Sequence, residues 1–155
     1  MKKKPYLIAL FFFIIDLISK QVIIHTISLN TSIQVINNFF YLTYVKNSGA
    51  AWSILKDERI LLLIISVIVL FLINKYMNKE KLSKLEEVSY GLIIGGIFGN
   101  LFDRIIYGFV IDFLDFKIFG YNYPIFNLAD TFIVIGVILM LIISFRKDRL
   151  WKKSK

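Results

Sequence analysis

The sequence predicts an all-α integral membrane protein with four transmembrane helices, both termini in the cytoplasm, and a small extracytoplasmic β-rich element between the first two helices. Three observations predict this fold class. First, 57% of the 155 residues are hydrophobic and the mean hydropathy is +0.70, whereas an average soluble domain is about 45–50% apolar. Second, four apolar runs approach the length of about 20 residues that a helix needs to cross a bilayer. Third, 13 of the 19 Lys and Arg residues lie on one side of these runs.

The apolar runs define four expected spans within a single membrane domain that covers residues 1–155. We expect the spans at about 6–27, 60–77, 88–107 and 125–145. Basic residues cluster before the first span, around the 78–87 loop and after the fourth span, so the positive-inside rule places these parts in the cytoplasm. Segments 28–59 and 108–124 then face outward. We interpret the first run as a retained span, because its apolar core is too long for a signal peptide and no small-residue cleavage site follows it.

The outer segment 28–59 has a strand-like composition. Its stretch SIQVINNFFYLTYVKN, at 32–47, is rich in β-branched and aromatic residues, and Asn37 and Asn38 form a candidate turn. We expect a two- or three-stranded sheet that rests at the membrane surface. An amphipathic surface loop is the alternative interpretation.

Composition excludes several kinds of chemistry. The chain has no cysteine, which excludes disulfides, thiol catalysis and zinc–thiolate sites. Its only histidine, His25, excludes an HExxH metalloprotease and a Ser-His-Asp triad. The net charge of +8 comes from basic clusters that flank the apolar runs, which favours a membrane surface over nucleic acid as the partner. We therefore expect no metal, no cofactor and no nucleic acid.

Polar residues within the apolar runs converge on the outer part of the membrane. They are Asp16, Lys20, Asn100, Asp103, Arg104, Asn127 and Asp130, with Asp112 in the outer loop between the last two spans. Polar groups in lipid need partners, so most of these residues are expected to support the structure. Asp16 and Lys20 have the i, i+4 spacing of a helical ion pair, and Asp103 and Arg104 are expected to pair with other helices.

Asp112 and Asp130 have no evident basic partner in the local sequence, although Lys117 could neutralise Asp112. Two neighbouring carboxylates cannot both ionise readily, so such a pair shares a proton at neutral pH. The charged member can then activate water while the protonated member polarises a carbonyl, which is the chemistry of an aspartic protease.

Two other functions fit the same residues. A small proton- or ion-coupled transporter would use Asp16, Asp103, Asp112 and Asp130 as a relay, but the sequence places ionisable groups only at the outer level. A structural membrane subunit would rely on Gly91, Gly95 and Gly99, whose four-residue spacing lets helices approach closely.

Five sequence blocks, taken together, resemble the bacterial lipoprotein signal peptidase (signal peptidase II) family over nearly the whole chain. They are DLISK at 16–20, KNSGAAWS at 46–53, GGIFGNLFDR at 95–104, GFVIDF at 108–113 and PIFNLADTFIVIG at 124–136. The resemblance implies an aspartic endopeptidase that removes signal peptides from lipoprotein precursors by cleaving before the diacylglyceryl-cysteine. It also implies a multi-pass protein of the bacterial cell membrane whose active site faces outward, with membrane lipids as surroundings and a monomeric state expected.

The resemblance also implies roles for individual residues. Asp112 and Asp130 would be the catalytic pair. The residues that would bind substrate or support the site are Asn47, Gly49, Ala50, Asn100, Arg104 and Asn127. Asp16, Lys20 and Asp103 would stabilise the core. Asp115 lies outside the matched blocks and is interpreted as an ordinary loop acid.

Overall fold

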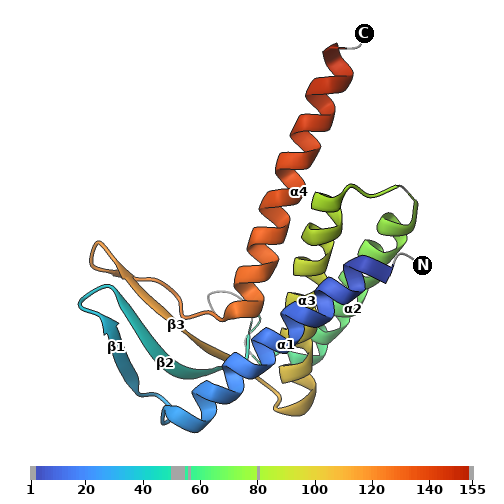
Figure 1. Ribbon diagram of the computed structural model, residues 1–155. Helices are drawn as coiled ribbons and strands as arrows, with labels where there is room; N and C mark the ends of the chain where they lie inside the picture. The colour runs from blue at the N-terminus through green and yellow to red at the C-terminus, as the bar shows by residue number, and fades with distance from the viewer. Residues whose placement is uncertain (1–2, 50–54, 56, 80, 154–155) are drawn as a thin grey trace.

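The computed structural model describes residues 3–49, 55, 57–79 and 81–153 (Figure 1). Four helices and four strands follow one another along the chain. They are α1 (Lys3–Thr26), β1 (Ser32–Ile36), β2 (Phe40–Asn47), α2 (Arg59–Lys79), α3 (Lys84–Ile106), β3 (Val110–Ile118), β4 (Tyr121–Asn122) and α4 (Leu128–Lys153).

Three of the helices are long and apolar enough to cross a membrane. By length and composition these segments are Lys3–Thr26, Arg59–Asn78 and Leu128–Lys147 in α1, α2 and α4. Within the described part of the chain α3 is not among them, although it is 23 residues long. It packs against the other three helices and buries much of its surface, so it can carry more polar residues than a lipid-facing helix. The span expected at 88–107 therefore stays a prediction.

Glycines on α3 allow α1 and α4 to approach closely. A Cβ atom at Gly95 would lie 2.6 Å from the Ala9 carbonyl oxygen of α1, and one at Gly91 would overlap Ile8. Gly99 leaves room for the Asp16 side chain and for Ala129 of α4. The expected packing face on the third helix is confirmed, and it is shared between two neighbouring helices.

The sheet is larger than the sequence predicts. Its four antiparallel strands follow the order β1-β2-β3-β4, and β3 and β4 come from the segment expected to be an outer loop, 108–124. The expectation of two or three strands confined to 28–59 is therefore wrong in extent. Asp is unfavourable in strands, and β3 contains two, which hides its apolar pattern. The predicted turn at Asn37 and Asn38 is confirmed, with Asn38 in the left-handed region at φ 51°.

One end of the sheet packs against the end of α1. A buried cluster joins Ile23 of α1 and Ile27, the residue after its end, to Tyr44 of β2 and to Ile111 and Phe113 of β3. The sheet projects from one end of the helices, whereas the start of α1, the α2–α3 connection and the end of α4 lie toward the other (Figure 1).

Ion pairs join the helix ends that lie away from the sheet. Lys147 of α4 lies 2.8 Å from Glu86 of α3, and Lys4 of α1 lies 3.9 Å from Glu87. The starts of α1 and α3 and the far part of α4 thus share one level. The common cytoplasmic side expected for both termini stays a prediction.

Candidate active site

Asn127 is the N-cap of α4 and fixes Asp130 in the first helical turn. The Asn127 Oδ1 atom accepts a hydrogen bond from the Asp130 backbone N–H at 3.0 Å, and Asp130 Oδ2 accepts one from the Asn127 backbone N–H at 3.3 Å. This reciprocal pair is a capping box, in which two otherwise unpaired amides at a helix start are satisfied. The positive end of the helix dipole also favours a carboxylate there. The NLAD sequence therefore sets the position of Asp130 locally.

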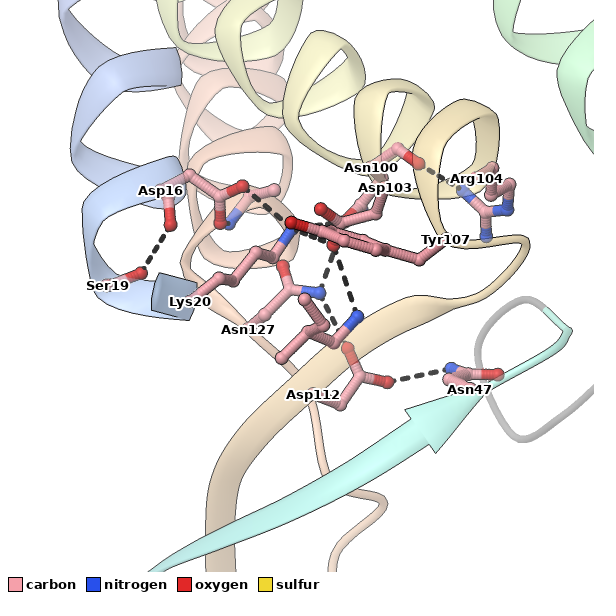
Figure 2. Close-up of polar contacts among 12 residues, drawn as sticks. Asp16, Ser19, Lys20, Asn47, Asn100, Asp103, Arg104, Tyr107, Asp112 and Asn127 are labelled. Carbon is pink, nitrogen blue, oxygen red and sulfur yellow. Dashed lines mark hydrogen bonds and ion pairs between the residues drawn. The ribbon is translucent and has the colours of Figure 1, made fainter. Parts of the chain in front are cut away.

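Asp112 reaches the same place from the sheet. Its Oδ1 atom accepts a hydrogen bond of 2.6 Å from Asn127 Nδ2, and its Oδ2 atom accepts one of 2.8 Å from Asn47 Nδ2 (Figure 2). Val45 pairs with Asp112 across the β2–β3 ladder, which places Asn47 beside the carboxylate. Asp112 is only 1% exposed. Asn127 therefore contacts both of the carboxylates proposed from the sequence.

The surroundings of Asp112 favour its protonated form. Burial and, to a smaller degree, the nearby Asp130 charge raise the pKa of the Asp112 carboxyl to about 7, against the hydrogen bonds from Asn47 and Asn127, which lower it. Loss of water contact is the larger cause, because a buried carboxylate loses most of its hydration. This carboxyl can therefore exchange a proton near neutral pH.

Asn100 of α3 connects the second carboxylate to a buried lysine. Its Nδ2 donates to Asp130 Oδ1 at 2.7 Å, and its Oδ1 accepts from Asn127 Nδ2 at 3.1 Å and from Lys20 Nζ at 3.2 Å. An ammonium group can only donate hydrogen bonds, so Lys20 must face the amide oxygen of Asn100. The Asn100 amino group is thereby directed at Asp130.

Lys20 is surrounded by acceptors from two helices. Its Nζ atom lies 2.7 Å from Asp16 Oδ2 and 2.9 Å from Asp103 Oδ2, in addition to its contact with Asn100 (Figure 2). The predicted Asp16–Lys20 pair is confirmed. Asp16 Oδ2 lacks a hydrogen bond of good geometry, so its contact with the ammonium is an ion pair. Both side chains are about 1% exposed, and removal of either partner would leave a buried charge unpaired.

The two acids paired with Lys20 also hold the backbone next to the candidate site. Asp16 Oδ1 accepts the Ala129 N–H at 2.9 Å, and Asp103 Oδ2 accepts the Ile111 N–H at 3.1 Å. Ala129 and Ile111 each precede one of the two site aspartates. The sequence predicts a supporting role for these acids, but nothing in it indicates that their acceptors would bind these particular amides.

Arg104 is directed toward the end of β2. Its Nη2 donates to the Gly49 carbonyl oxygen at 2.9 Å, and its Nη1 donates to the Asn100 carbonyl oxygen at 3.3 Å. The Gly49 N–H in turn donates to Asn47 Oδ1 at 2.9 Å. Arg104 and Gly49 therefore help to fix Asn47 beside Asp112. Ala50 lies outside the described residues.

Two other charged residues of β3 lie in different surroundings. Lys117, expected as a possible partner of Asp112, places its Nζ atom 4.4 Å from the centre of the Tyr41 ring. Asp115 accepts a hydrogen bond of 2.6 Å from Thr43 Oγ1 across the sheet, so it is a strand residue and its interpretation as a loop acid is wrong. Within the described ranges, no three His, Asp or Glu side chains converge as metal ligands would.

Comparison with known proteins identifies the family. The family model for signal peptidase (SPase) II matches residues 8–146. The chain belongs to the signal peptidase II family. Two solved structures, each described as a bacterial membrane enzyme structure by the in meso method, are similar to it. The one at 2.3 Å resolution has 38% sequence identity and a TM-score of 0.89, covering 100% of this chain and 94% of that chain. The one at 1.9 Å has 38% identity and a TM-score of 0.82, with 92% of each chain covered.

Family membership makes this chain a protease with several membrane-spanning helices and supports a function in processing lipoprotein signal peptides. All described site residues named from the sequence, from Asp16 on α1 to Asp130 on α4, lie in one connected network of hydrogen bonds and ion pairs.

Proposed function

We propose that this signal peptidase II is an aspartic endopeptidase whose catalytic pair is Asp112 and Asp130. The observation that carries the proposal is the position of Asn127, which donates to one carboxylate and forms a capping box with the other. Two carboxylates on one asparagine, with Asp112 almost fully buried, favour a pair that shares one proton.

The proposed reaction needs only this pair and a water molecule. The ionised carboxylate takes a proton from water, whose oxygen attacks the scissile carbonyl carbon, while the protonated carboxyl donates its proton to the carbonyl oxygen. The tetrahedral intermediate collapses when the amide nitrogen takes a proton from one carboxyl group, the C–N bond breaks, and the other carboxylate takes a proton from one of the two hydroxyl groups of the intermediate, which restores the pair to its starting state. The hydrogen bonds from Asn47, Asn100 and Asn127 hold both carboxylates in place during these transfers.

The proposed substrate is a lipoprotein precursor cleaved before its diacylglyceryl-modified cysteine. The acyl chains of such a cysteine would hold the scissile bond at the lipid boundary. Asp112 lies on β3 and Asp130 in the first turn of the apolar helix α4, so the level of the pair suits a bond held in this way. We propose that this level is the extracytoplasmic side of the membrane.

Conversion of either aspartate to asparagine tests the assignment. Asp112→Asn and Asp130→Asn keep the side-chain size but replace a carboxyl group with an amide that cannot take up or release the catalytic proton, so each should lower cleavage by at least about 10²-fold, the usual contribution of general acid–base catalysis. The assay uses purified protein and a lipid-modified precursor beside its unmodified twin, with products identified by mass. The modified precursor should be cleaved faster, and EDTA should have no effect.

Asp115→Asn is the matched control, because Asp115 lies on the same strand and its partner is Thr43. This variant should cleave at the wild-type rate. Undiminished processing by Asp112→Asn or Asp130→Asn would refute the dyad, and equal cleavage of the two precursors would refute the dependence on acyl chains.

A further inference from the structure

β2 has an open edge next to Asp112. β1 pairs with β2 from Phe40 to Thr43, and the chain before β1 bonds Tyr44 through Asn30 N–H and the Thr31 carbonyl oxygen. Near the end of β2, Lys46 pairs with Ile111 of β3, and no other described strand lies along the far side of Lys46.

The backbone of Lys46 points toward this open side. Residues opposite each other in an antiparallel ladder alternate between hydrogen-bonded and non-hydrogen-bonded pairs. Lys46 is opposite Ile111, and the Ile111 N–H donates to Asp103 Oδ2 instead of to β2. Lys46 and Ile111 are therefore a non-hydrogen-bonded pair, and the N–H and C=O groups of Lys46 face away from β3. No described residue bonds them.

A peptide that is cut at this site needs hydrogen-bond partners for its backbone N–H and C=O groups. A helix bonds its own backbone and shields its carbonyl carbons, so the precursor must be extended around the scissile bond. Its freed N–H and C=O groups then lie near lipid, where each unpaired group is costly. Lys46 immediately precedes Asn47, whose amide donates to Asp112, so the open edge adjoins the carboxylate pair.

We infer that the open edge at Lys46 binds the precursor as an added β-strand, on the mature side of the scissile bond. This inference rests on the proposed function. Strands in a sheet are about 4.8 Å apart, so an added strand would lie about two strand spacings from β3 and could not itself present the scissile bond to Asp112. The precursor residue that pairs with Lys46 therefore follows the scissile bond in the precursor sequence. β2 runs toward the helices, whereas the mature part of the precursor runs away from them, so the added strand would be antiparallel to β2.

A proline substitution tests the edge from the enzyme side. Proline removes the N–H and is tolerated in a sheet only where that N–H is unpaired. Lys46→Pro should therefore fold, as judged by thermal unfolding, and its KM should exceed that of Lys46→Ala by about 2- to 12-fold, the value of one hydrogen bond. Both variants lack the ammonium group, so their difference isolates the backbone. Val35→Pro, at the unpaired bulge of β1, introduces a proline far from the two carboxylates and should leave KM unchanged.

N-methylation of the substrate tests the same edge without altering the enzyme. A series of lipid-modified precursors, each with one N-methyl amide on the mature side, should show one position at which KM with wild-type enzyme rises by about 2- to 12-fold.

If wild-type enzyme cleaves the precursor but no position raises KM, and Lys46→Pro matches Lys46→Ala, the added strand is refuted while the catalytic pair stands. If wild-type enzyme cleaves no lipid-modified precursor, the proposed function itself fails. A dimer that Lys46→Pro dissociates without a change in KM would assign the edge to a second copy instead.

Discussion

Asn127 is the residue on which both carboxylates depend. Its side chain uses the amide oxygen to cap α4 at Asp130 and the amino group to bond Asp112 and Asn100. A carboxylate at this position could not donate, and a hydroxyl has one proton for two acceptors. The chemistry of the amide explains why asparagine stands between a helix start and a strand. The sequence predicts a supporting role here, but it cannot show that one amide serves both acids.

The raised pKa of Asp112 predicts a basic limit to activity. Its carboxyl keeps a proton up to a pH of about 7, so at higher pH both members of the pair become ionised and the proton donor for the scissile carbonyl is lost. Cleavage should fall about ten-fold per pH unit well above that value. The measurement is kcat/KM between pH 5 and 9 with detergent-solubilised enzyme.

The Asp115→Asn variant should show the same limit at high pH, because Asp115 is not a member of the pair. A rate that stays constant from pH 6 to 9 would contradict a shared proton that titrates near neutral pH.

At the scale of single elements, the helices were easier to predict than the strands. Long apolar runs with charged flanks determine helices such as α2 almost alone. β3 is stabilised instead by its partners, since it pairs with β2 and its Ile111 and Phe113 pack on α1. Those contacts join segments more than 60 residues apart. A period-two pattern interrupted by Asp112 and Asp115 could not reveal them.

The contact between α1 and α3 predicts a sensitive glycine. In Gly95→Ala the added methyl group would lie 2.6 Å from the Ala9 carbonyl oxygen and 3.0 Å from Phe12 Cβ, so the two helices must separate. Overpacking of this kind costs about 1–3 kcal/mol. Because α1 carries Asp16 and Lys20 to the site, cleavage should fall together with stability. The measurement is thermal unfolding in detergent beside the cleavage rate.

Val67→Ile is the control for Gly95→Ala, since it also adds one methyl group, but to a side chain of α2 that is 56% exposed. It should unfold at the wild-type temperature. Equal stability of Gly95→Ala and wild type would mean that the two helices are not tightly packed at this position.

For the whole molecule, the site exists only because four distant segments meet. α1 supplies Lys20, α3 supplies Asn100, the sheet supplies Asp112, and α4 supplies Asp130. The sequence predicts that these residues share one depth, because their distances from the span ends can be counted. It cannot predict which atoms meet, since that depends on helix rotation and on the β2–β3 register. Lys20, Asp16 and Asp103 are paired with one another instead of facing lipid, which explains how charged residues are tolerated at this depth.

The arrangement of the chain in the membrane is the last prediction, and the absence of cysteine allows a direct test of it. We expect the sheet outside and the α2–α3 connection in the cytoplasm, because the basic residues flank the helix ends away from the sheet. Asn122→Cys places one thiol on exposed β4, and Lys81→Cys places one in the connection before α3. In spheroplasts, a membrane-impermeant maleimide should label Asn122→Cys only, and after detergent treatment both variants should be labelled. Labelling of Lys81→Cys in intact spheroplasts would reverse the orientation and would place the carboxylate pair on the cytoplasmic side, where an exported precursor held by its acyl chains in the outer leaflet could not reach it.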